Sequence, residues 1–553
     1  MRRRQRNLQR GSILQPTFQR LGLRGVRLLP LAILAFSMAS AAQAQLDTAN
    51  FRILSGLSGD SGDHVGSALA VGDFDGDGLD DLAIGVPGAS GSNGGEVGRL
   101  VYYLGAASGF GTNGSFSPAF LGLDIEAGAR FGAALAAGDF NGDGFDDLAI
   151  GIPGRVVAGD DNAGQVVILY ADGLNNGGSP WDVSDPALFS QANLAGQVEA
   201  GDSFGMSLAA GDLNQDGLDD LAVGVPLEDI FASGFGIRVD AGAVNVIYSV
   251  DGVGLTTADN EVLHLEVDNV SQNAGHDDLF GFSLAIADFT GDLQPDLAVG
   301  VPGDFIGAAD GSGSVEIFET DGNGINVLAD EQLFNQADPD IQGTPSENDS
   351  FGFSLAVGDF DGNGRADLAV GVPGDEEFKT FADEGAIQIF YGRINGLSTL
   401  NDQFFTAEAG GGPYFPAAFN RWGEALATGD FDSNGLDDLA VGAPLSNWEG
   451  VPNSGQVNVF YGLSTQFGLQ VVGIQHFNMS LFGSLAAGDE FGFALATGNF
   501  ANSNGGAGLI VGVPNLEAFG DPERGSAVFI RSGFPFLDGF ETGDTSRWSA
   551  VVP

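Results

Sequence analysis

Aspartate-rich nonapeptides recur along this chain, and their residue types are those of a cation site. The first runs from Asp73 to Asp81 and reads DFDGDGLDD. With Asp73 as position 1, carboxylates stand at positions 1, 3, 5 and 9, and the glycine at position 6 permits a sharp turn. These carboxylates can converge with the backbone carbonyl of position 7. Such hard oxygens suit Ca²⁺, which takes roughly 6 to 8 oxygen ligands, so the spacing predicts a calcium loop.

Five loops carry this pattern, with aspartate or asparagine at positions 3 and 5. The predicted ligands are Asp73, Asp75, Asp77, the Leu79 carbonyl and Asp81; Asp139, Asn141, Asp143, the Phe145 carbonyl and Asp147; Asp212, Asn214, Asp216, the Leu218 carbonyl and Asp220; Asp359, Asp361, Asn363, the Arg365 carbonyl and Asp367; and Asp430, Asp432, Asn434, the Leu436 carbonyl and Asp438. We predict about five Ca²⁺ ions, one for each loop. The alternative for a single loop is a solvated Asp/Gly turn without metal.

Two further copies of the loop are incomplete. In the fourth, Thr290 replaces the position-3 ligand and Leu293 the glycine, which leaves Asp288, Asp292 and Asp296 as a weak site. The seventh reads NFANS from Asn499, and we predict that it binds no metal. An EF-hand would place Glu at position 12, whereas the first loop has Ile84 there, inside a strand pattern. The loops are therefore predicted to join strands, not helices.

The loops belong to a repeat that organises the chain. Their first residues lie 66 to 76 residues apart, and the repeat cores span 63–88, 130–154, 202–226, 279–303, 350–374, 421–444 and 490–514. Each unit holds four short runs with aliphatic residues at alternate positions. In the first unit, Leu82, Ile84 and Val86 can face one side while Ala83 and Gly85 let another sheet approach. Seven units of four strands predict an all-β fold, a seven-bladed β-propeller over residues 45–534.

The two ends of the repeat array are complementary. A strand pattern near 50–54 resembles a fourth strand without its first three, and the last copy ends after its third strand, at 527–530. Pairing these ends would complete the seventh blade and leave no unpaired edge in the ring. The alternative is that residues 45–62 are a disordered remnant of the leader.

Phe-Gly pairs precede the aspartate loops, and a Gly-Val-Pro, Gly-Ile-Pro or Gly-Ala-Pro triplet follows them. The pairs are Phe131-Gly132, Phe204-Gly205, Phe280-Gly281, Phe351-Gly352 and Phe491-Gly492, while two copies depart from the pattern with Val65-Gly66 and Trp422-Gly423. In these motifs the chain resembles the FG-GAP repeats of the integrin alpha-subunit propeller and its bacterial relatives. The resemblance covers nearly all of the chain after residue 45. It implies calcium loops in β-hairpins and ligand binding on the opposite face.

Composition limits the partners. The chain has 553 residues, no Cys and 74 acidic against 20 basic residues, for a net charge of -54. A polyanion does not attract nucleic acid or an anionic membrane surface, so we expect no nucleic-acid partner and cations as the natural counterpart. The absence of Cys excludes disulfides, thiolate nucleophiles and zinc-thiolate sites. The 43% of hydrophobic residues supply a packed core.

Residues 1–44 have the order of a secretory signal peptide. Eight arginines precede an apolar run from Leu28 to Met38, and Ala42-Gln43-Ala44 follows as a cleavage site. The apolar run is about half of the ~20 residues that a spanning helix needs, so we predict cleavage before Gln45 and no transmembrane span thereafter. The exported chain would carry 12 basic against 74 acidic residues. The expected location is extracellular, cell-surface or periplasmic.

In a four-stranded propeller blade, the calcium loops lie on one face of the ring, and the longer loops that differ between copies lie on the other. Those loops are rich in large apolar side chains: Ile230, Phe231, Phe235, Phe305, Phe378, Phe381, Tyr414, Phe415, Trp448 and Phe519. We therefore predict a secreted or cell-surface, monomeric adhesion module, which binds a protein or glycan on the face opposite the calcium loops. A lectin-like propeller is the alternative.

The signals for catalysis are weak. The chain has four His and neither an HExxH motif nor a P-loop, and its one G-x-S-x-G match, Gly201–Gly205, lies at the start of a repeat. We predict that the protein is not an enzyme, with a propeller hydrolase or lyase as the less favoured alternative. Residues 535–553 resemble a short segment at the C-termini of exported bacterial proteins. They are either a sorting or anchoring signal or a free terminus.

Overall fold

The fold was analysed in a computed structural model of the 553-residue chain. The chain divides into Met1–Ala42 and Gln43–Pro553, and everything described below lies in the second unit. The structure describes residues 45–54, 62–91, 95–107, 109–176, 179–232, 235–266, 274–307, 309–326, 332–376, 383–407, 420–463, 468–483, 485–500, 506–516 and 525–533. The predicted signal peptide and the C-terminal tail after residue 533 lie outside these ranges. Among the described residues, no helix has the length and apolar character needed to cross a bilayer.

Seven four-stranded antiparallel sheets form the blades, which confirms the predicted all-β, seven-bladed propeller. From the inner to the outer strand, the blades are β2 (Ala68–Gly72), β3 (Asp81–Val86), β4 (Arg99–Tyr103) and β5 (Asn113–Phe116); β6 (Ala134–Gly138), β7 (Asp147–Ile152), β8 (Gln165–Leu169) and β11 (Ala187–Phe189); β12 (Ser207–Gly211), β13 (Asp220–Val225), β16 (Ala243–Ile247) and β19 (Glu261–Leu263); β20 (Ser283–Ala287), β21 (Asp296–Val301), β22 (Ser314–Phe318) and β23 (Gln332–Phe334); β24 (Leu355–Gly358), β25 (Asp367–Val372), β26 (Ala386–Arg393) and β27 (Gly396–Thr406); β28 (Ala425–Gly429), β29 (Asp438–Ala443), β30 (Gln456–Leu463) and β31 (Gly468–Phe477); and β32 (Leu495–Gly498), β33 (Gly508–Val513), β34 (Ser526–Gly533) and β1 (Gln45–Leu54).

Shorter elements lie outside the seven four-stranded sheets. Three two-stranded ribbons pair β9 (Ala171–Asn176) with β10 (Ser179–Trp181), β14 (Ile230–Ala232) with β15 (Gly236–Arg238), and β17 (Ser249–Val250) with β18 (Gly254–Leu255). The helical elements that the structure describes are two 3₁₀ turns, Pro118–Leu121 and Met479–Leu481.

The second strand of each blade is the core of its sheet. In blade 1 every residue of β3 is buried, because its two faces pack against the two neighbouring blades. Glycine in this strand permits the close approach of those blades: a Cβ at Gly85 would lie 2.0 Å from the Gly132 carbonyl oxygen of blade 2. A large apolar residue at position 2 of the aspartate loop adds bulk to this core: Phe74 in blade 1 and Leu213 in blade 3 are both fully buried.

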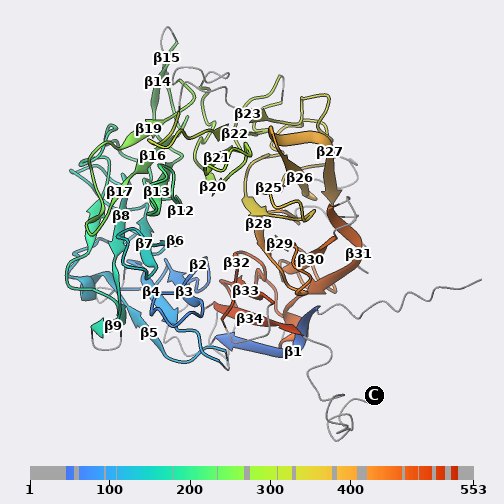
Figure 1. The fold of residues 1–553 in the computed structure, drawn as a ribbon, viewed down its shortest axis with the longest axis horizontal. Coiled ribbons are helices and arrows are strands. Elements are labelled where there is room, and N and C mark those ends of the chain that lie inside the picture. Colours follow the sequence, from blue (N-terminus) through green and yellow to red (C-terminus); the bar gives the residue numbers. More distant parts are fainter. Residues whose placement is uncertain are drawn as a thin grey trace, which may run out of the picture. The chain divides into compact units, whose positions relative to one another are not determined.

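The inner strands of successive blades face one another around the centre of the ring, as Figure 1 shows. Tyrosines at the ends of third strands join the blades farther out. The Tyr248 hydroxyl of blade 3 accepts a hydrogen bond from the Ile325 N–H of blade 4 at 3.1 Å. The Tyr391 hydroxyl of blade 5 accepts one from the Leu469 N–H of blade 6 at 3.2 Å.

Blade 7 is assembled from both ends of the described chain. Strand β1 pairs antiparallel with β34, with Leu54 opposite Ala527. Leu46 and Leu54 of this strand are buried, and the Leu46 N–H donates to Gln475 Oε1 of blade 6 at 3.1 Å. The strand begins five residues before the 50–54 pattern. The outer edge of β34 is thereby covered.

Candidate metal centre

The predicted calcium loops join the first and second strands of the blades, and we call each of them an Asp loop. The position-1 carboxylate organises the loop by accepting backbone N–H groups. In blade 1, Asp73 Oδ1 accepts from the Asp77 N–H at 3.0 Å and Asp73 Oδ2 from the Gly78 N–H at 2.9 Å. Equivalent bonds are made by Asp139, Asp212, Asp288, Asp359 and Asp430. Six loops therefore share one backbone shape.

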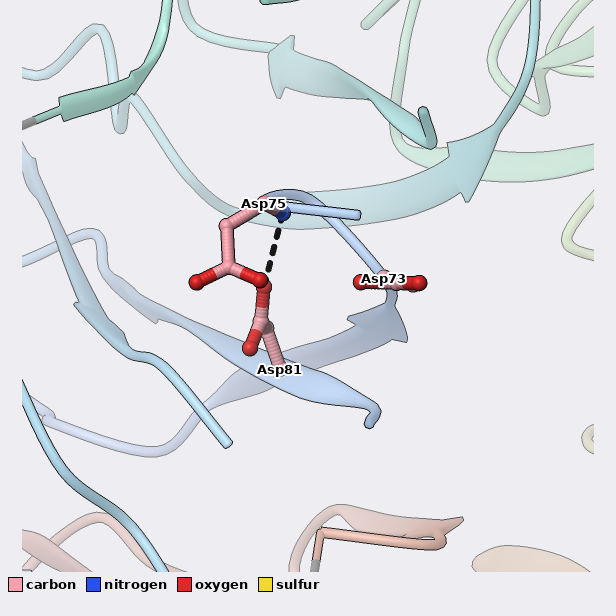
Figure 2. Close-up of side chains that lie close together, drawn as sticks. All are labelled: Asp73, Asp75 and Asp81. Atoms are coloured by element: carbon pink, nitrogen blue, oxygen red, sulfur yellow. Dashed lines mark hydrogen bonds between the residues drawn. The ribbon is translucent and has the colours of Figure 1, made fainter. Parts of the chain in front are cut away.

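Carboxylates of positions 1, 3 and 9 come together in three Asp loops. Their ligand oxygens lie within 4.8 Å of one another in the groups Asp73, Asp75 and Asp81; Asp359, Asp361 and Asp367; and Asp430, Asp432 and Asp438. Figure 2 shows the blade 1 group, in which the Asp75 N–H also donates to Asp81 Oδ2 at 3.2 Å. Three carboxylates converging on one point repel one another, and a divalent cation between them relieves that repulsion.

The position-9 aspartate is the first residue of the second strand and is fully buried. In blade 1, Asp81 Oδ2 accepts from the Phe74 N–H at 2.9 Å and Oδ1 from the Gly105 N–H at 2.6 Å. Burial raises the pKa of Asp81 to about 8, against the effect of these hydrogen bonds, and the charges of Asp75 and Asp73 add to the rise. Burial likewise raises the pKa of Asp367 and of Asp438 to about 8. A bound cation favours the charged form of each group.

The blade 6 group fits a cation best. Asp432 is only 5% exposed, and its Oδ2 is buried without a hydrogen-bond partner among the described residues. Its Oδ1 accepts from the Asn434 N–H at 3.1 Å. Burial raises the pKa of Asp432 to about 6. A buried carboxylate oxygen with no partner, beside two further carboxylates, is the chemistry of an oxygen ligand for a hard cation.

In the Asp loops of blades 2 and 3, position 3 is Asn141 or Asn214, so positions 1, 3 and 9 supply two carboxylates in place of three. The amide oxygen of Asn141 accepts from the Asp143 N–H at 2.9 Å, and that of Asn214 from the Asp216 N–H at 2.9 Å. Burial raises the pKa of Asp147 to about 8 and that of Asp220 to about 7. These loops keep the shape and the buried position-9 acid of the clustered loops.

Positions 5 and 7 are placed differently from positions 1, 3 and 9. None of the three carboxylate groups found among the described residues includes a position-5 side chain. Instead, position-5 side chains accept the N–H of position 7 in five loops: Asp77 from Leu79, Asp143 from Phe145, Asp216 from Leu218, Asp292 from Gln294, and Asn434 from Leu436. In blade 5, the Asn363 amide donates to the Gly392 carbonyl at 3.1 Å, and Arg365 extends to the Gly291 carbonyl of blade 4. A role for positions 5 and 7 as metal ligands stays a prediction.

The incomplete loops differ from the others. Among the described residues, Asp288, Asp292 and Asp296 of blade 4 do not form a group of converging carboxylates. Leu293, which replaces the glycine, has φ +73° and is exposed, so the loop shape is kept at the cost of backbone strain. In blade 7, Asn499 and Phe500 are described, but residues 501–505 lie outside the described residues.

The aspartate at position 8 is a structural residue that the sequence analysis missed. In blade 2, Asp146 Oδ2 accepts the N–H of Asp73 in blade 1 at 2.8 Å, while its own N–H donates to the Asp73 carbonyl at 3.2 Å. Asp80, Asp219 and Asp437 make the same pair of bonds to the preceding blade. This position is Pro295 in blade 4 and Ala366 in blade 5. The recurrence of Asp at position 8 in four copies is the sequence feature from which a structural role could have been predicted.

The opposite face carries a hairpin, β14–β15, in the loop that follows the second strand of blade 3. It projects from that blade in Figure 1, and Phe231, Phe235 and Ile237 are exposed by 72%, 67% and 58%. A pocket of about 530 Å³ lies beside it, with Ala195, Gly196, Gln197, Glu199, Glu228, Asp229, Ile230, Phe231, Ile237, Val262 and His264 in its wall. The pocket is therefore apolar and acidic together.

Five segments match the FG-GAP repeat: residues 65–103, 131–169, 204–247, 351–390 and 422–460. They belong to blades 1, 2, 3, 5 and 6, the blades with complete Asp loops. This is an integrin alpha-like FG-GAP repeat protein. Because its Asp loops lie between adjacent antiparallel strands, they are β-hairpin loops of the repeat and not EF-hands.

Curated relatives of this FG-GAP protein include integrin alpha subunits. It is 30% identical to integrin alpha-PS2 of Drosophila melanogaster over 252 residues, which is 45% of this chain and 16% of the relative. It is 32% identical to integrin alpha-3 of Mus musculus over 183 residues, 33% of this chain and 15% of the relative. It is also 27% identical to phosphatidylinositol-glycan-specific phospholipase D of Homo sapiens over 413 residues, 69% of this chain and 43% of the relative. The chain spans less than half the length of these relatives.

Proposed function

We propose that this FG-GAP protein is an exported adhesion module that recognises a protein partner through the face opposite its Asp loops. The observation that carries the proposal is the β14–β15 hairpin. Exposed aromatic side chains on a projecting hairpin are unusual for a surface in water, and they supply the large contact area that binding anchors use. The integrin alpha relatives support recognition of proteins as the general role.

The chemistry around the hairpin indicates the kind of partner. Glu199, Glu228 and Asp229 lie in the wall of the adjacent pocket, together with the apolar side chains of Ile237 and Val262. A partner surface with an apolar patch and a basic side chain would complement both features. The overall charge of -54 favours a basic partner further.

In this proposal, calcium has a structural role in the Asp loops. Positions 1, 3 and 9 would hold the ion, which would supply positive charge that fixes the loop between the first and second strands. Extracellular calcium modules bind with a Kd of roughly 10⁻⁴ to 10⁻³ M, so the loops would fill after export. The predicted signal peptide over residues 1–44 supports this order of events.

A binding assay tests the recognition surface. Protein-coated beads are tested for adhesion to a panel of purified extracellular-matrix proteins and glycans, in calcium and in EGTA. Phe231→Ala combined with Phe235→Ala should abolish adhesion to the protein that the unaltered beads bind. The matched control is Val472→Ala on β31, a residue that is 79% exposed but far from the hairpin in sequence. Equal adhesion of the hairpin variant would refute the proposed surface.

Glycan recognition is the second candidate, and a pocket near the ring centre favours it. This pocket of about 550 Å³ lies where the turns before β2, β6, β12 and β32 meet. Its wall combines Arg130, Glu96 and Asn515, which can hydrogen-bond to sugar hydroxyls, with Phe493, which is 37% exposed. Glycan-array binding that Phe493→Ala removes would support this candidate over protein recognition.

A hydrolase is a weaker candidate, and it rests on the phospholipase D relative alone. That name belongs to a protein of which this chain covers 43%. A screen of phosphoester and polysaccharide substrates, with EDTA controls, would detect the activity.

A further inference from the structure

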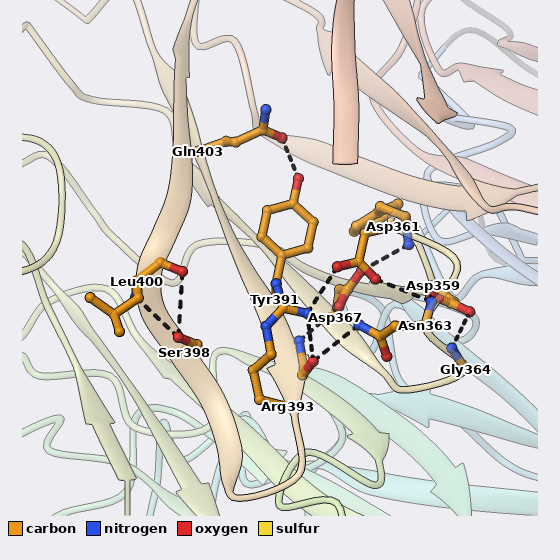
Figure 3. A network of polar contacts seen from close by, with 12 residues as sticks. Asp359, Asp361, Asn363, Gly364, Asp367, Tyr391, Arg393, Ser398, Leu400 and Gln403 are labelled. Carbon is orange, nitrogen blue, oxygen red and sulfur yellow. Dashed lines mark hydrogen bonds and ion pairs between the residues drawn. The ribbon is translucent and has the colours of Figure 1, made fainter. Parts of the chain in front are cut away.

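In one of the three clustered Asp loops, an arginine side chain from a neighbouring strand is paired with a carboxylate. In blade 5, Arg393 Nη1 lies 2.8 Å from Asp361 Oδ2. Figure 3 shows the guanidinium group reaching from the end of β26 to the group of Asp359, Asp361 and Asp367. The same Nη1 also donates to the Gly392 carbonyl at 3.0 Å. The Asp361 side chain is only 10% exposed, so this ion pair is shielded from water on the aspartate side.

The other two clustered loops have no cation at the corresponding position. Corresponding positions are found from a glycine in each blade whose N–H donates to Oδ1 of the position-9 aspartate: Gly392 in blade 5, Gly105 in blade 1 and Gly462 in blade 6. The residue that follows is Arg393 in blade 5, Ala106 in blade 1 and Leu463 in blade 6. Blade 5 thus has a guanidinium group at a position where the other two clustered loops have a small or aliphatic side chain.

Blades 5 and 6 differ most clearly at the position-3 carboxylate. Asp432 Oδ2 in blade 6 is buried without a partner among the described residues, whereas Asp361 Oδ2 in blade 5 is paired with Arg393. A calcium ion in blade 5 must therefore compete with a guanidinium group for an oxygen that is open in blade 6. It must also bind a group whose net negative charge is smaller by one, and the charge of the ligand set tunes calcium affinity.

We propose that Arg393 is a built-in counter-ion of the blade 5 Asp loop. It neutralises part of the carboxylate repulsion without metal, keeps the loop in its folded shape at low calcium, and makes blade 5 the weakest of the three clustered calcium sites. The inference rests on the proposed binding of calcium by the Asp loops. The second arginine of this loop, Arg365, reaches away toward the Gly291 carbonyl of blade 4, at 3.4 Å, and so is not the paired group.

Amide hydrogen exchange during a calcium titration of the exported chain, residues 45–553, tests the inference loop by loop. The reporters are the N–H groups held by position 1, namely Gly364 in blade 5 and Gly435 in blade 6. Without calcium, Gly364 should exchange more slowly than Gly435. With calcium, half-protection of the blade 5 loop should need about tenfold more metal than that of the blade 6 loop.

Two reciprocal variants exchange the residues that blades 5 and 6 have at this position. Arg393→Leu should bring the calcium midpoint of blade 5 to within about threefold of that of blade 6 and speed exchange of Gly364 in EGTA. Leu463→Arg should raise the calcium midpoint of blade 6 by about tenfold and leave blade 1 unchanged. If one variant does not fold, the other still tests the claim.

The outcomes separate this inference from the proposal of calcium binding itself. If no loop responds to calcium in the unaltered protein, calcium binding is refuted, and the inference with it. If blades 1 and 6 respond but blade 5 has the same midpoint, or if neither variant moves a midpoint, calcium binding stands and the role of Arg393 is refuted.

Discussion

Glu228 is a residue whose burial links stability to pH. Its side chain is buried, with 6% exposed, and its carboxylate accepts a hydrogen bond from the Gln191 amide. Burial is the main cause that raises the pKa of Glu228 to about 8, and the nearby charges of Asp202, Glu199 and Asp229 add to the rise. The folded pKa lies above the ordinary value of 4.5, so the fold favours the protonated form. Its contribution to stability is therefore full below pH 4.5 and is lost as pH rises through 8.

Glu228→Gln should remove this dependence, because the amide has no charge to bury. We expect the variant to be more stable than the unaltered protein by roughly 1–3 kcal/mol at pH 9 and equally stable at pH 4. Urea unfolding at both pH values, in EGTA to exclude metal effects, measures the difference. A variant that is less stable than the unaltered protein at pH 9 would show that Gln191 holds a carboxylate that the fold needs in charged form.

At the scale of elements, the position-8 aspartates join the Asp loop of one blade to the next. Two effects oppose each other at Asp146: it accepts the N–H of Asp73, yet burial and the charges of Asp73, Asp139 and Asp80 raise its pKa. A substitution that removes only the charge should therefore differ from one that also removes the acceptor.

We predict that Asp146→Ala is less stable than Asp146→Asn by about 1 kcal/mol, because asparagine keeps the acceptor oxygen. Urea unfolding at pH 7 in EGTA compares the two. The exposed Asp185 provides the control, since its Ala and Asn variants should not differ. Equal stability of the two Asp146 variants would mean that the bond between blades contributes nothing.

The sequence predicts the repeated blade but not the contacts between distant residues or the hairpin of blade 3. Seven copies of one pattern predict the blade, because alternation, glycine spacing and loop residues agree in each copy. The close approach at Gly85 and the alternating strand pattern of Leu82, Ile84 and Val86 follow from local rules alone. The Arg393–Asp361 pair joins residues 32 positions apart, and the Asp146–Asp73 bond joins two blades, so neither follows from a local pattern. The β14–β15 hairpin is an insertion in one copy, where repetition gives no guidance.

For the whole molecule, ring closure by β1 is the most consequential contact. The strand covers β34, buries Leu46 and Leu54, and places Arg52 Nη1 2.7 Å from the Phe110 carbonyl of blade 1. A propeller without it has an open edge and six complete blades.

A chain that begins at residue 55 should lose roughly 5 kcal/mol or more of stability relative to one that begins at residue 45, through the two buried leucines alone. It should also self-associate through the exposed edge of β34. Urea unfolding and sedimentation velocity measure the two effects. An unchanged unfolding midpoint in a monomeric truncated chain would mean that β1 does not close the ring.

The most direct test of the whole account is thermal unfolding of residues 45–553 with calcium titrated against EGTA, and with bound metal counted in parallel. Each site that binds only the folded state contributes about 2.7 kcal/mol at a calcium concentration 100 times its Kd. We predict a large rise in Tm, about five bound ions, and one ion fewer in Asp432→Ala. An unchanged Tm with no bound calcium would contradict the account, because the Asp loops would then be metal-free turns.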